Sequence, residues 1–361
     1  MDISIIGATG GCGREMVNQL IRDRILERTE VLQLVSSNPN TNRPHLLHGL
    51  RADLQDAYAE IIPQIDVTSD PDDIIGDVII MTAGVTFSTD MADMDSAGVN
   101  RDMLARNNTE IFEKFAKAIY ENRKDNPPVV IIVTNPVELG VEIFCRYLPR
   151  ENVIGMGAYS DSLRFRWEIA SELGIKRQRV QGYMLGEHGS WMVPLWSSVR
   201  VQGFSPVEWK IAKERLMEKC DLERFHKKLA EEQSKIIEIL SADHIDGPGK
   251  ALQHVRTCSA DLRVGLKPFV VHFSEAKTLQ ATATATTELV KAVFEGKAIE
   301  IAVQYKLEGE EGLHIPFGSR VILAGKVERV VPSDDISEAE MKLIQKSGAV
   351  IARKLKEWTG V

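Results

Sequence analysis

The segment GEHGSWMVPLWS (186–197) holds a histidine, His188, in a turn of glycine and polar residues. An imidazole in such a turn can exchange a proton near neutral pH, as general acid–base catalysis requires. A second segment, YSDSLRFR (159–166), carries Asp161 and Arg164 three residues apart, so that both can face one side of a helix. Asp161 could orient the imidazole and stabilise its charged form, and Arg164 could bind a carboxylate in a two-pronged pair.

His188, Asp161 and Arg164 together suit one class of reaction. A proton donor, an acid that orients it and an arginine for a carboxylate are what hydride exchange with a 2-oxo acid needs, with a nicotinamide supplying the hydride. Each residue alone indicates little, because a single histidine in a glycine-rich turn is more often structural and an Asp–Arg pair at helical spacing is usually a surface ion pair. The hypothesis therefore requires a nucleotide site elsewhere in the chain.

The segment GATGGCG (7–13) is a candidate for that nucleotide site. It follows an apolar run that predicts a buried strand, and it precedes a helical pattern over 14–26. Gly7 permits the sharp turn, Gly10 lets the backbone approach a pyrophosphate, and Gly13 lets the helix pack closely on the strand. Backbone N–H groups and the positive end of the helix dipole would then face the phosphate. The spacing is GxxGxxG, which differs from the GxGxxG fingerprint of dinucleotide-binding turns.

The end of the second expected strand bears on which dinucleotide would bind. The fingerprint places an acid there to bind the adenosine ribose, but this strand ends with Ser36 and Ser37. Hydroxyl groups, unlike a carboxylate, would not repel a 2′-phosphate, and Arg43 is close enough in sequence to reach one. We therefore expect NADP as cofactor, or use of both NADP and NAD. The alternative is that the two serines only cap a turn.

Strand and helix patterns alternate through the first half of the chain. The expected strands, which are short and apolar, are 3–7, 30–36, 77–84, 128–136 and 152–157. Such strands alternating with helices predict a parallel sheet that is covered on both faces. The loops GATGGCG, SSN, TAG and TNP follow the carboxyl ends of four of these strands, so they should converge on the crevice where such sheets bind ligands.

The second half mixes helices with strands that have an antiparallel pattern. The expected helices are 161–173, 207–240, 280–295 and 337–358, and the expected strands are 298–309, 314–325 and 326–331. Ser337 and Glu340 have the spacing of a capping box. The expected fold class is α/β, with a Rossmann doubly wound parallel sheet that binds NAD(P) over 1–157. An α+β catalytic and substrate domain is expected to follow over 158–361.

The composition of the 361 residues argues against several function classes. A net charge of −8 does not suit a nucleic-acid partner, which would require a basic face. The longest apolar run, 127–133, is too short to span a membrane. Met1 leads directly into a strand pattern without the basic and apolar regions of a signal peptide, so we expect a cytoplasmic protein without a membrane partner.

The cysteines and histidines show no spacing that is typical of a metal site, and we expect no metal. The scattered cysteines, which fit a reducing cytoplasm, are Cys12, Cys145, Cys220 and Cys258. Cys12 lies inside the glycine turn, where the start of a helix can make a thiol unusually acidic and oxidation-sensitive. The alternative is that Cys12 only packs.

Seven segments spread over nearly the whole chain form a specific set. They are GATGGCG (7–13), TAG (82–84), RDMLARNN (101–108), VTNPVE (133–138), GMGAYSDSLRF (155–165), GEHGSWMVPL (186–195) and LEGEEGLHIPFGSRVIL (307–323). Together they resemble the lactate/malate dehydrogenase family, and most of all its archaeal-type malate dehydrogenases. The resemblance implies an NAD(P)-dependent oxidoreductase that interconverts an L-2-hydroxy carboxylate and its 2-oxo acid, assembled as a homodimer or homotetramer.

The resemblance also implies roles for individual residues. His188 would donate and accept the proton, with Asp161 as its partner. Arg164 would bind the substrate C1 carboxylate, and Arg101 would polarise the reacting carbonyl when a loop closes over the substrate. The other expected substrate contacts are Asn135 and Thr278. The expected cofactor contacts are Gly7, Gly10, Gly11, Gly13, Ser36, Ser37, Thr82, Ala83, Gly84, Asn108, Thr134 and Asn135.

Two segments depart from the family's pattern. The loop 85–100 is longer than in relatives and lacks the Arg or Gln that selects malate or lactate there. It carries Phe87 and three aspartates, so the substrate could have an apolar or cationic side chain; alternatively the acids only face solvent. These aspartates are Asp90, Asp93 and Asp95. The segment 242–276 is the second departure, and it would cover the same cleft or extend a subunit interface.

Two other classes of function compete with the dehydrogenase. A catalytically silent nucleotide-binding scaffold would keep the glycine turn but would need no complete acid–base set. An NAD-dependent glycosidase would require metal-site Cys/His chemistry near the active centre. The joint presence of His188, Asp161 and Arg164 favours the dehydrogenase.

Overall fold

The structure is a computed structural model that describes residues 1–36, 44–85, 97–274, 276–332 and 336–360. For residues 97–102 it describes the backbone alone. Two expected features fall outside these limits. They are the ribose end of the cofactor site at Ser37 and Arg43, and most of the long loop 85–100.

The first half of the chain forms a parallel sheet with the strand order β3-β2-β1-β4-β5-β6. The strands are β1 (Ile3–Ile6), β2 (Val31–Val35), β3 (Gln64–Thr68), β4 (Val78–Met81), β5 (Val129–Ile132) and β6 (Val153–Gly155). Every residue of β1, β4 and β5 is buried, because helices cover both faces of the sheet. The Rossmann-like parallel sheet that the apolar runs predicted is thereby confirmed.

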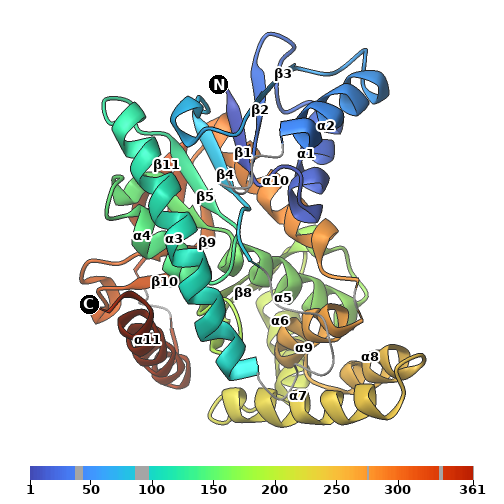
Figure 1. Cartoon of the computed structure of the whole chain (residues 1–361). Helices are drawn as coiled ribbons and strands as arrows, with labels where there is room; N and C mark the ends of the chain where they lie inside the picture. Colours follow the sequence, from blue (N-terminus) through green and yellow to red (C-terminus); the bar gives the residue numbers. More distant parts are fainter. Residues whose placement is uncertain (37–43, 86–96, 275, 333–335, 361) are drawn as a thin grey trace.

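Five helices lie against this parallel sheet (Figure 1). They are α1 (Gly11–Arg22), α2 (Pro44–Ala57), α3 (Ala97–Arg123), α4 (Val137–Phe144) and α10 (Leu279–Glu295). Helix α10 comes from the second half of the chain, and it runs beside α1. The small residues of its ATATATT stretch (281–287) allow this close packing, and they are buried at Ala283, Ala285 and Thr286.

The second half adds five antiparallel strands to the same sheet. These are β7 (Val180–Gly186), β8 (Met192–Val201), β9 (Ile299–Lys306), β10 (Pro316–Ala324) and β11 (Lys326–Val330). Gly155 of β6 pairs with Gln304 of β9, and this pair joins the two sets of strands into one sheet of eleven. The α/β C-terminal part is confirmed, while the domain division at 157 stays a prediction.

The remaining helices form the lower part of Figure 1. They are α5 (Gly157–Leu173), α6 (Pro206–Met217), α7 (Phe225–Ala242), α8 (Gly247–Thr257), α9 (Ala260–Phe273) and α11 (Glu338–Thr359). Helices α5 and α11 pack on this second set of strands, α9 packs on α5, and α7 and α8 pack on α9. The expected capping box is present at the start of α11, where the Ser337 side chain accepts from the Glu340 backbone N–H.

One expectation about local structure was wrong, and one further segment acquired elements that no expectation covered. The helical pattern over 207–240 forms two helices, α6 and α7, separated by 218–224. The segment 242–276, for which no elements were expected, folds into α8 and α9. His188 lies in the turn between β7 and β8, in agreement with the tight turn expected there. Helical periodicity alone could not locate these breaks, because the tertiary contacts of each piece decide where it turns.

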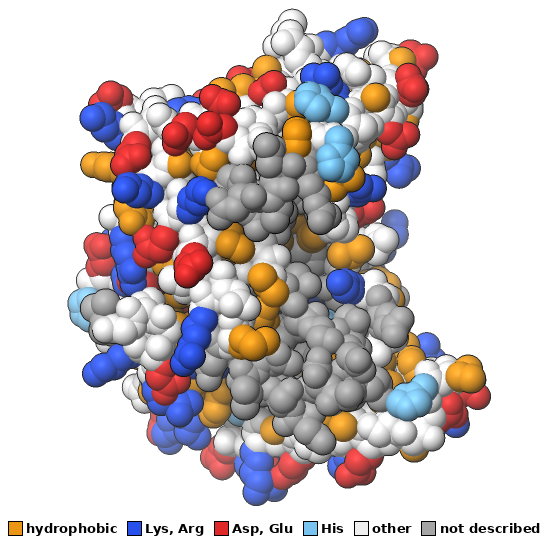
Figure 2. Space-filling model, viewed as in Figure 1, with side chains coloured by type: hydrophobic (Ala, Val, Ile, Leu, Met, Phe, Trp, Pro, Cys, Tyr) orange, Lys and Arg blue, Asp and Glu red, His pale blue; other side chains and the backbone are white. Residues whose placement is uncertain are grey.

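The face of the molecule drawn in Figure 2 is mixed in charge. Figure 2 shows basic and acidic side chains interspersed over the described part of the face drawn. Of the helices described, not one combines the length and the apolar character that crossing a bilayer would require.

The glycine turn after β1 depends on two close backbone approaches. Gly7 has a φ of 91°, which favours glycine, and a Cβ at this position would lie 2.7 Å from Thr82 Oγ1. A Cβ on Gly13 would lie 2.3 Å from the carbonyl oxygen of Gly7 and 2.8 Å from Ala8 Cα. These contacts support the expected roles of Gly7 in the turn and of Gly13 in packing α1 onto β1.

Replacing Gly13 with alanine should destabilise the fold, because the added methyl group collides with backbone that cannot move freely. Overpacking of this kind costs about 1–3 kcal/mol. Gly49 in α2 is the matched control, since a Cβ there meets nothing within 4 Å and Gly49→Ala should stabilise the helix by about 0.5–1 kcal/mol. Urea unfolding of both variants measures this difference, and equal unfolding midpoints would contradict the packing role of Gly13.

Candidate active site around His188

A histidine, an aspartate and an arginine meet where α5 faces the β7–β8 turn. His188 Nδ1 lies 2.8 Å from Asp161 Oδ2, and Arg164 Nη1 donates to Asp161 Oδ1, also at 2.8 Å. The Asp161 side chain is only 3% exposed, while His188 and Arg164 retain about a fifth of their side-chain surface. The carboxylate is therefore buried between two cationic partners, each of which also faces open space.

The electrostatics of this pair favour a charged carboxylate and a basic imidazole. Burial alone would raise the pKa of Asp161, but the charge and hydrogen bond of His188, and then those of Arg164, hold this pKa below its usual value. Burial alone would lower the pKa of His188, but the charge and hydrogen bond of Asp161 outweigh it and raise this pKa. The imidazole therefore keeps a proton to higher pH than a free histidine.

Glu138 and Gly157 also position His188, and sequence reasoning assigned neither of them a role. The His188 backbone N–H donates to Glu138 Oε1 at 2.8 Å, and burial, followed by the charge of Glu187, raises the pKa of Glu138 to about 7. A Cβ on Gly157 would lie 2.4 Å from His188 Cγ, so only glycine lets α5 approach the imidazole this closely. Glu138 lay within the quoted VTNPVE segment, which was the available signal.

The C-terminal helix α11 also contributes to the turn that holds His188. Glu187, which is 4% exposed, forms an ion pair with Lys354 and accepts from the Trp191 backbone N–H at 3.1 Å. Ser347 Oγ accepts from the Glu187 backbone N–H at 3.2 Å. The hairpin turn is thus attached to a segment far along the chain.

His188 opens onto a cavity of about 710 Å³. This cavity is lined by His188 and by four other residues that the sequence predicted to bind the substrate or to assist proton transfer. They are Asp161, Arg164, Asn135 and Thr278. The cavity also carries four aromatic side chains, which are Trp191, Phe269, Phe273 and Trp358. The expected site residues from α5, the β5–α4 turn and the start of α10 are therefore brought together in one space.

The glycine turn borders the same region through α10. Thr278, at the N-cap of α10, lines the cavity, and a Cβ on Gly11 would lie 3.1 Å from Cδ1 of the next residue, Leu279. Gly10 is the N-cap of α1; no side chain caps this helix, and its first turn contains no acid. The Gly10 N–H donates to the Gly7 carbonyl at 3.0 Å, which closes the turn. Gly11, the first residue of α1, is exposed, so the N–H groups of the described helix start fit a phosphate.

Hydrogen bonds tie together the turns that follow β4 and β5. The Thr82 hydroxyl donates to the Ile6 carbonyl at 2.7 Å, and the Thr134 hydroxyl donates to the Ala83 carbonyl at 2.9 Å. The amide of Asn108, which is fully buried, donates to the Asn135 carbonyl at 2.7 Å. Asn108 thus holds the turn at Asn135, whose peptide bond to Pro136 is cis.

The side chains of several expected site residues lie outside the described part of the structure. Ser37 and the three aspartates of the long loop lie outside the described residues, and of Arg101 only the helical backbone in α3 is described. Ser36 lies at the end of β2, where its backbone N–H donates to the Thr68 carbonyl at 3.0 Å.

The hypothesis of an acidic thiol at Cys12 was wrong. Burial, and then the charge of Glu15, raises the pKa of Cys12 to about 11. The desolvation of the thiolate outweighs any benefit from the helix start, so Cys12 remains protonated near neutral pH.

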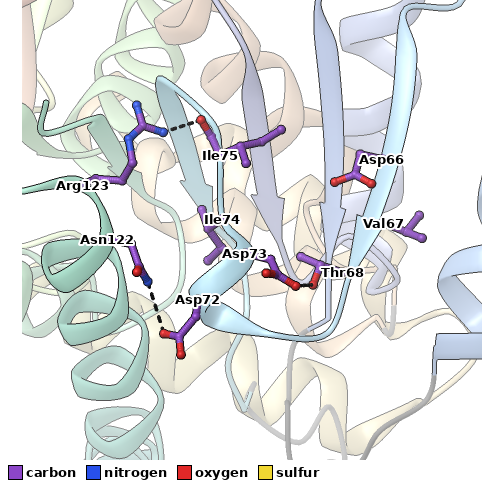
Figure 3. Close-up of a pocket in the computed structure, with 9 residues that line it drawn as sticks. All are labelled: Asp66, Val67, Thr68, Asp72, Asp73, Ile74, Ile75, Asn122 and Arg123. Carbon is purple, nitrogen blue, oxygen red and sulfur yellow. Dashed lines mark hydrogen bonds between the residues drawn. The ribbon is translucent and has the colours of Figure 1, made fainter.

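A second hollow lies along the connection from β3 to β4, beside the end of α3 (Figure 3). Three of its lining residues are acids, namely Asp66, Asp72 and Asp73. The Asn122 amide donates to Asp72 at 3.3 Å, and the Thr68 hydroxyl donates to Asp73 at 3.2 Å. Such acids would repel a phosphate or a carboxylate, and none of the described residues that line this hollow lines the cavity at His188. The candidate site is therefore the cavity at His188.

The fold and this cavity define a class: a nucleotide-binding α/β protein with a buried Asp–His pair beside an arginine. Residues 1–155 match the family model of the lactate/malate dehydrogenase NAD-binding domain, and residues 160–247 match that of the lactate/malate dehydrogenase alpha/beta C-terminal domain. The chain belongs to the lactate/malate dehydrogenase family.

The names of related proteins refer to different substrates. An L-2-hydroxycarboxylate dehydrogenase (NAD(P)(+)) of Methanocaldococcus jannaschii is 31% identical over 210 residues, which are 56% of this chain and 62% of the relative. L-lactate dehydrogenase B of Hordeum vulgare is 29% identical over 56% of this chain and 54% of its own length. A malate dehydrogenase of Methanothermobacter thermautotrophicus is 29% identical over 71% and 76%. The chain thus spans less than two thirds of the length of the first two relatives.

Solved structures share the fold over almost the whole chain. The minor L-lactate dehydrogenase of Enterococcus mundtii has a TM-score of 0.72 and 22% identity, covering 98% of this chain and 97% of that one. The malate dehydrogenase of Aeropyrum pernix has a TM-score of 0.70 and 22% identity over the same shares. At such identities the likeness extends to the fold alone.

The Asp161→Asn variant should lower the pKa of His188. Asparagine removes the negative charge that stabilises the imidazolium, so the effect of burial then dominates. NMR titration of the His188 ring protons measures the shift. Asp23→Asn is the control, because Asp23 pairs with Lys291 at the surface and should leave the His188 pKa unchanged. An unchanged pKa in Asp161→Asn would contradict this account of the pair.

Proposed function

We propose that the protein is an NAD(P)-dependent dehydrogenase that interconverts an L-2-hydroxy carboxylate and its 2-oxo acid. The observation that carries this proposal is the contact of His188 with buried Asp161, beside Arg164, in a cavity next to the glycine turn. Membership of the lactate/malate dehydrogenase family supports it.

In this mechanism His188 moves the proton of the substrate hydroxyl. Its Nδ1 is engaged by Asp161, so Nε2 is the atom that accepts this proton during oxidation and returns it during reduction. Arg164 has one Nη bonded to Asp161 and still lines the cavity, where its remaining N–H groups bind the substrate carboxylate. The chemistry that a nicotinamide cofactor supplies is hydride exchange with the substrate carbon.

The charge of the imidazole sets the pH dependence of each direction. Oxidation requires neutral His188, so its rate rises as pH passes upward through the His188 pKa, whereas reduction requires the protonated form and its rate falls there. Because Asp161 raises this pKa, both transitions lie above the pKa of about 6.5 of a free imidazole.

The other predicted contacts follow from the same arrangement. Asn135 and Thr278, which both line the cavity, contact the substrate or the nicotinamide, and Asn108 acts by holding the Asn135 turn. Arg101 polarises the carbonyl when its loop closes, which excludes water. The N–H groups at the start of α1, from Gly11 onward, would bind the pyrophosphate, and Gly10 lets the backbone approach it.

The cofactor preference and the assembly are finer parts of the proposal. Ser36 and Ser37 in place of an acid favour NADP, or use of both cofactors. We propose a cytoplasmic homodimer or homotetramer, as in the family that the sequence resembles.

The aromatic lining of the cavity favours a second candidate, a 2-hydroxy acid with a bulky apolar side chain. Phe269 and Phe273 stack edge to face with ring centroids 4.9 Å apart, and both line the cavity from α9. Helix α9 belongs to the segment that departs from the family's pattern. A dicarboxylate would gain little from this surface, whereas a phenyl or branched side chain would be desolvated there.

A panel of 2-hydroxy acids assayed with NAD and with NADP tests the proposed activity. It includes malate, lactate and branched, aromatic and cationic acids, and at least one should be oxidised. His188→Asn should lower kcat by about 10²–10⁴-fold, because the proton acceptor is lost, while cofactor binding followed by fluorescence persists. His314→Asn, at an exposed histidine, is the control. Absence of turnover with every acid, or parental turnover in His188→Asn, would overturn the proposal.

The variant Phe269→Leu should separate the two substrate candidates. Losing the aromatic contact should lower kcat/KM for a phenyl-bearing acid by roughly tenfold, since such contacts contribute about 0.5–1.5 kcal/mol, and should leave lactate unaffected. Phe294→Leu, at a partly buried ring that does not line the cavity, is the control. Equal losses for phenyl-bearing and small acids would argue against the bulky substrate.

A further inference from the structure

Three side chains able to ligate a metal meet where α7 and the end of α8 pack together. Glu232 comes from α7, His254 from the last turn of α8, and Cys258 is the residue that ends α8. Their ligand atoms all lie within 4.8 Å of one another. None of the three lines the cavity at His188, so the cluster is separate from the proposed active site.

The spacing of the three atoms is close to that of a tetrahedral site. His254 Nε2 lies 2.6 Å from Glu232 Oε2, and Cys258 Sγ lies 3.8 Å from the same oxygen. Around a tetrahedral zinc ion, ligand atoms at ordinary bond lengths are roughly 3.3–3.6 Å apart. A metal would therefore replace the His254–Glu232 hydrogen bond and draw the sulfur slightly inward.

The chemistry of the set points to zinc. A thiolate, an imidazole and a carboxylate are the ligand types that zinc takes, while magnesium and calcium prefer oxygen ligands alone. The side chains of His254 and Glu232 are 28% and 18% exposed, so an ion can enter from solvent. Lys235 Nζ holds the other carboxylate oxygen, Glu232 Oε1, at 2.7 Å, which leaves Oε2 directed at the cluster.

We propose that Glu232, His254 and Cys258 form a zinc site with water as the fourth ligand. Ligation by sulfur requires the thiolate, so the thiol proton of Cys258 passes to the solvent when the metal binds. The sequence did not predict this site, because only His254 and Cys258 are close in the chain and Glu232 reaches them from another helix.

The site would fix the start of α9, and through it one wall of the active-site cavity. Cys258 lies two residues before the start of α9, and its carbonyl accepts from Arg263 Nη1 at 2.9 Å. Arg263 Nε in turn donates to buried Glu168 of α5 at 2.6 Å. Zinc at Cys258 would therefore join α7 to the segment that carries Phe269 and Phe273. Its role is structural, because no ligand faces the reacting atoms.

The alternative is that the cluster binds no metal and that Glu232 and His254 form an ordinary ion pair. Metal titration of the full-length protein, after removal of metals with a chelator, decides between the two. We expect one Zn²⁺ per chain, and we expect Co²⁺ to give the charge-transfer absorption of a thiolate ligand. Stoichiometric binding should also raise the melting temperature, since the ion binds the folded state.

Two ligand variants and two controls make the test specific. Cys258→Ser and His254→Gln should each weaken Zn²⁺ binding at least about tenfold and abolish the rise in melting temperature. Cys145→Ser and His244→Gln remove a distant thiol and an exposed imidazole of the α7–α8 connection, and they should bind as the parent does.

The proposal is overturned if the parent binds no Zn²⁺, if the Co²⁺ complex lacks the thiolate band, or if the ligand variants bind like the controls. Should Cys258→Ser fail to fold, His254→Gln and the Co²⁺ spectrum of the parent still decide. Because every readout is metal binding or stability, a failure here leaves the proposed dehydrogenase activity standing.

Discussion

The buried carboxylate of Asp161 is the interaction on which the candidate site depends. A charge with 3% of its side chain exposed is costly unless each oxygen is paired, and here one oxygen meets His188 and the other meets Arg164. The same pairing fixes the separation of a proton carrier and a carboxylate-binding arginine. The stabilisation of one buried charge thus also sets the geometry of the proposed chemistry.

Segments from distant parts of the chain keep His188 in this position. Glu138 at the start of α4 holds its backbone, Gly157 gives room for its ring, and Glu187 is paired with Lys354 of α11. Because α4 follows a strand of the parallel sheet and α11 packs on the antiparallel strands, the site requires both parts of the eleven-stranded sheet. The β6–β9 pairing that joins them is therefore functionally important in this proposal.

The local pattern of apolar and polar residues in the sequence predicted those strands and helices in which burial is uniform or clearly periodic. Strands β1, β4 and β5 are buried throughout and were recognised as apolar runs, and α10 and α11 were recognised by their helical spacing. Strand β3 was missed because none of its residues is fully buried, and α4 was missed because seven of its eight residues are buried and show no polar face. The breaks that produce α6, α7, α8 and α9 come from packing that no local pattern contains.

The sequence by itself determined the α/β class, the glycine turn and the placing of Asp161 and Arg164 on one helix face, because these depend on residues that are adjacent or three apart on one helix. It also nominated His188, Asn135 and Thr278, although it could not show that they share one cavity. Only the tertiary structure brought Glu138 and Gly157 to His188, and Glu232 to His254, because contacts between elements far apart in the chain leave no spacing to read. The three-dimensional fold, and not the order of the residues, decides which side chains meet.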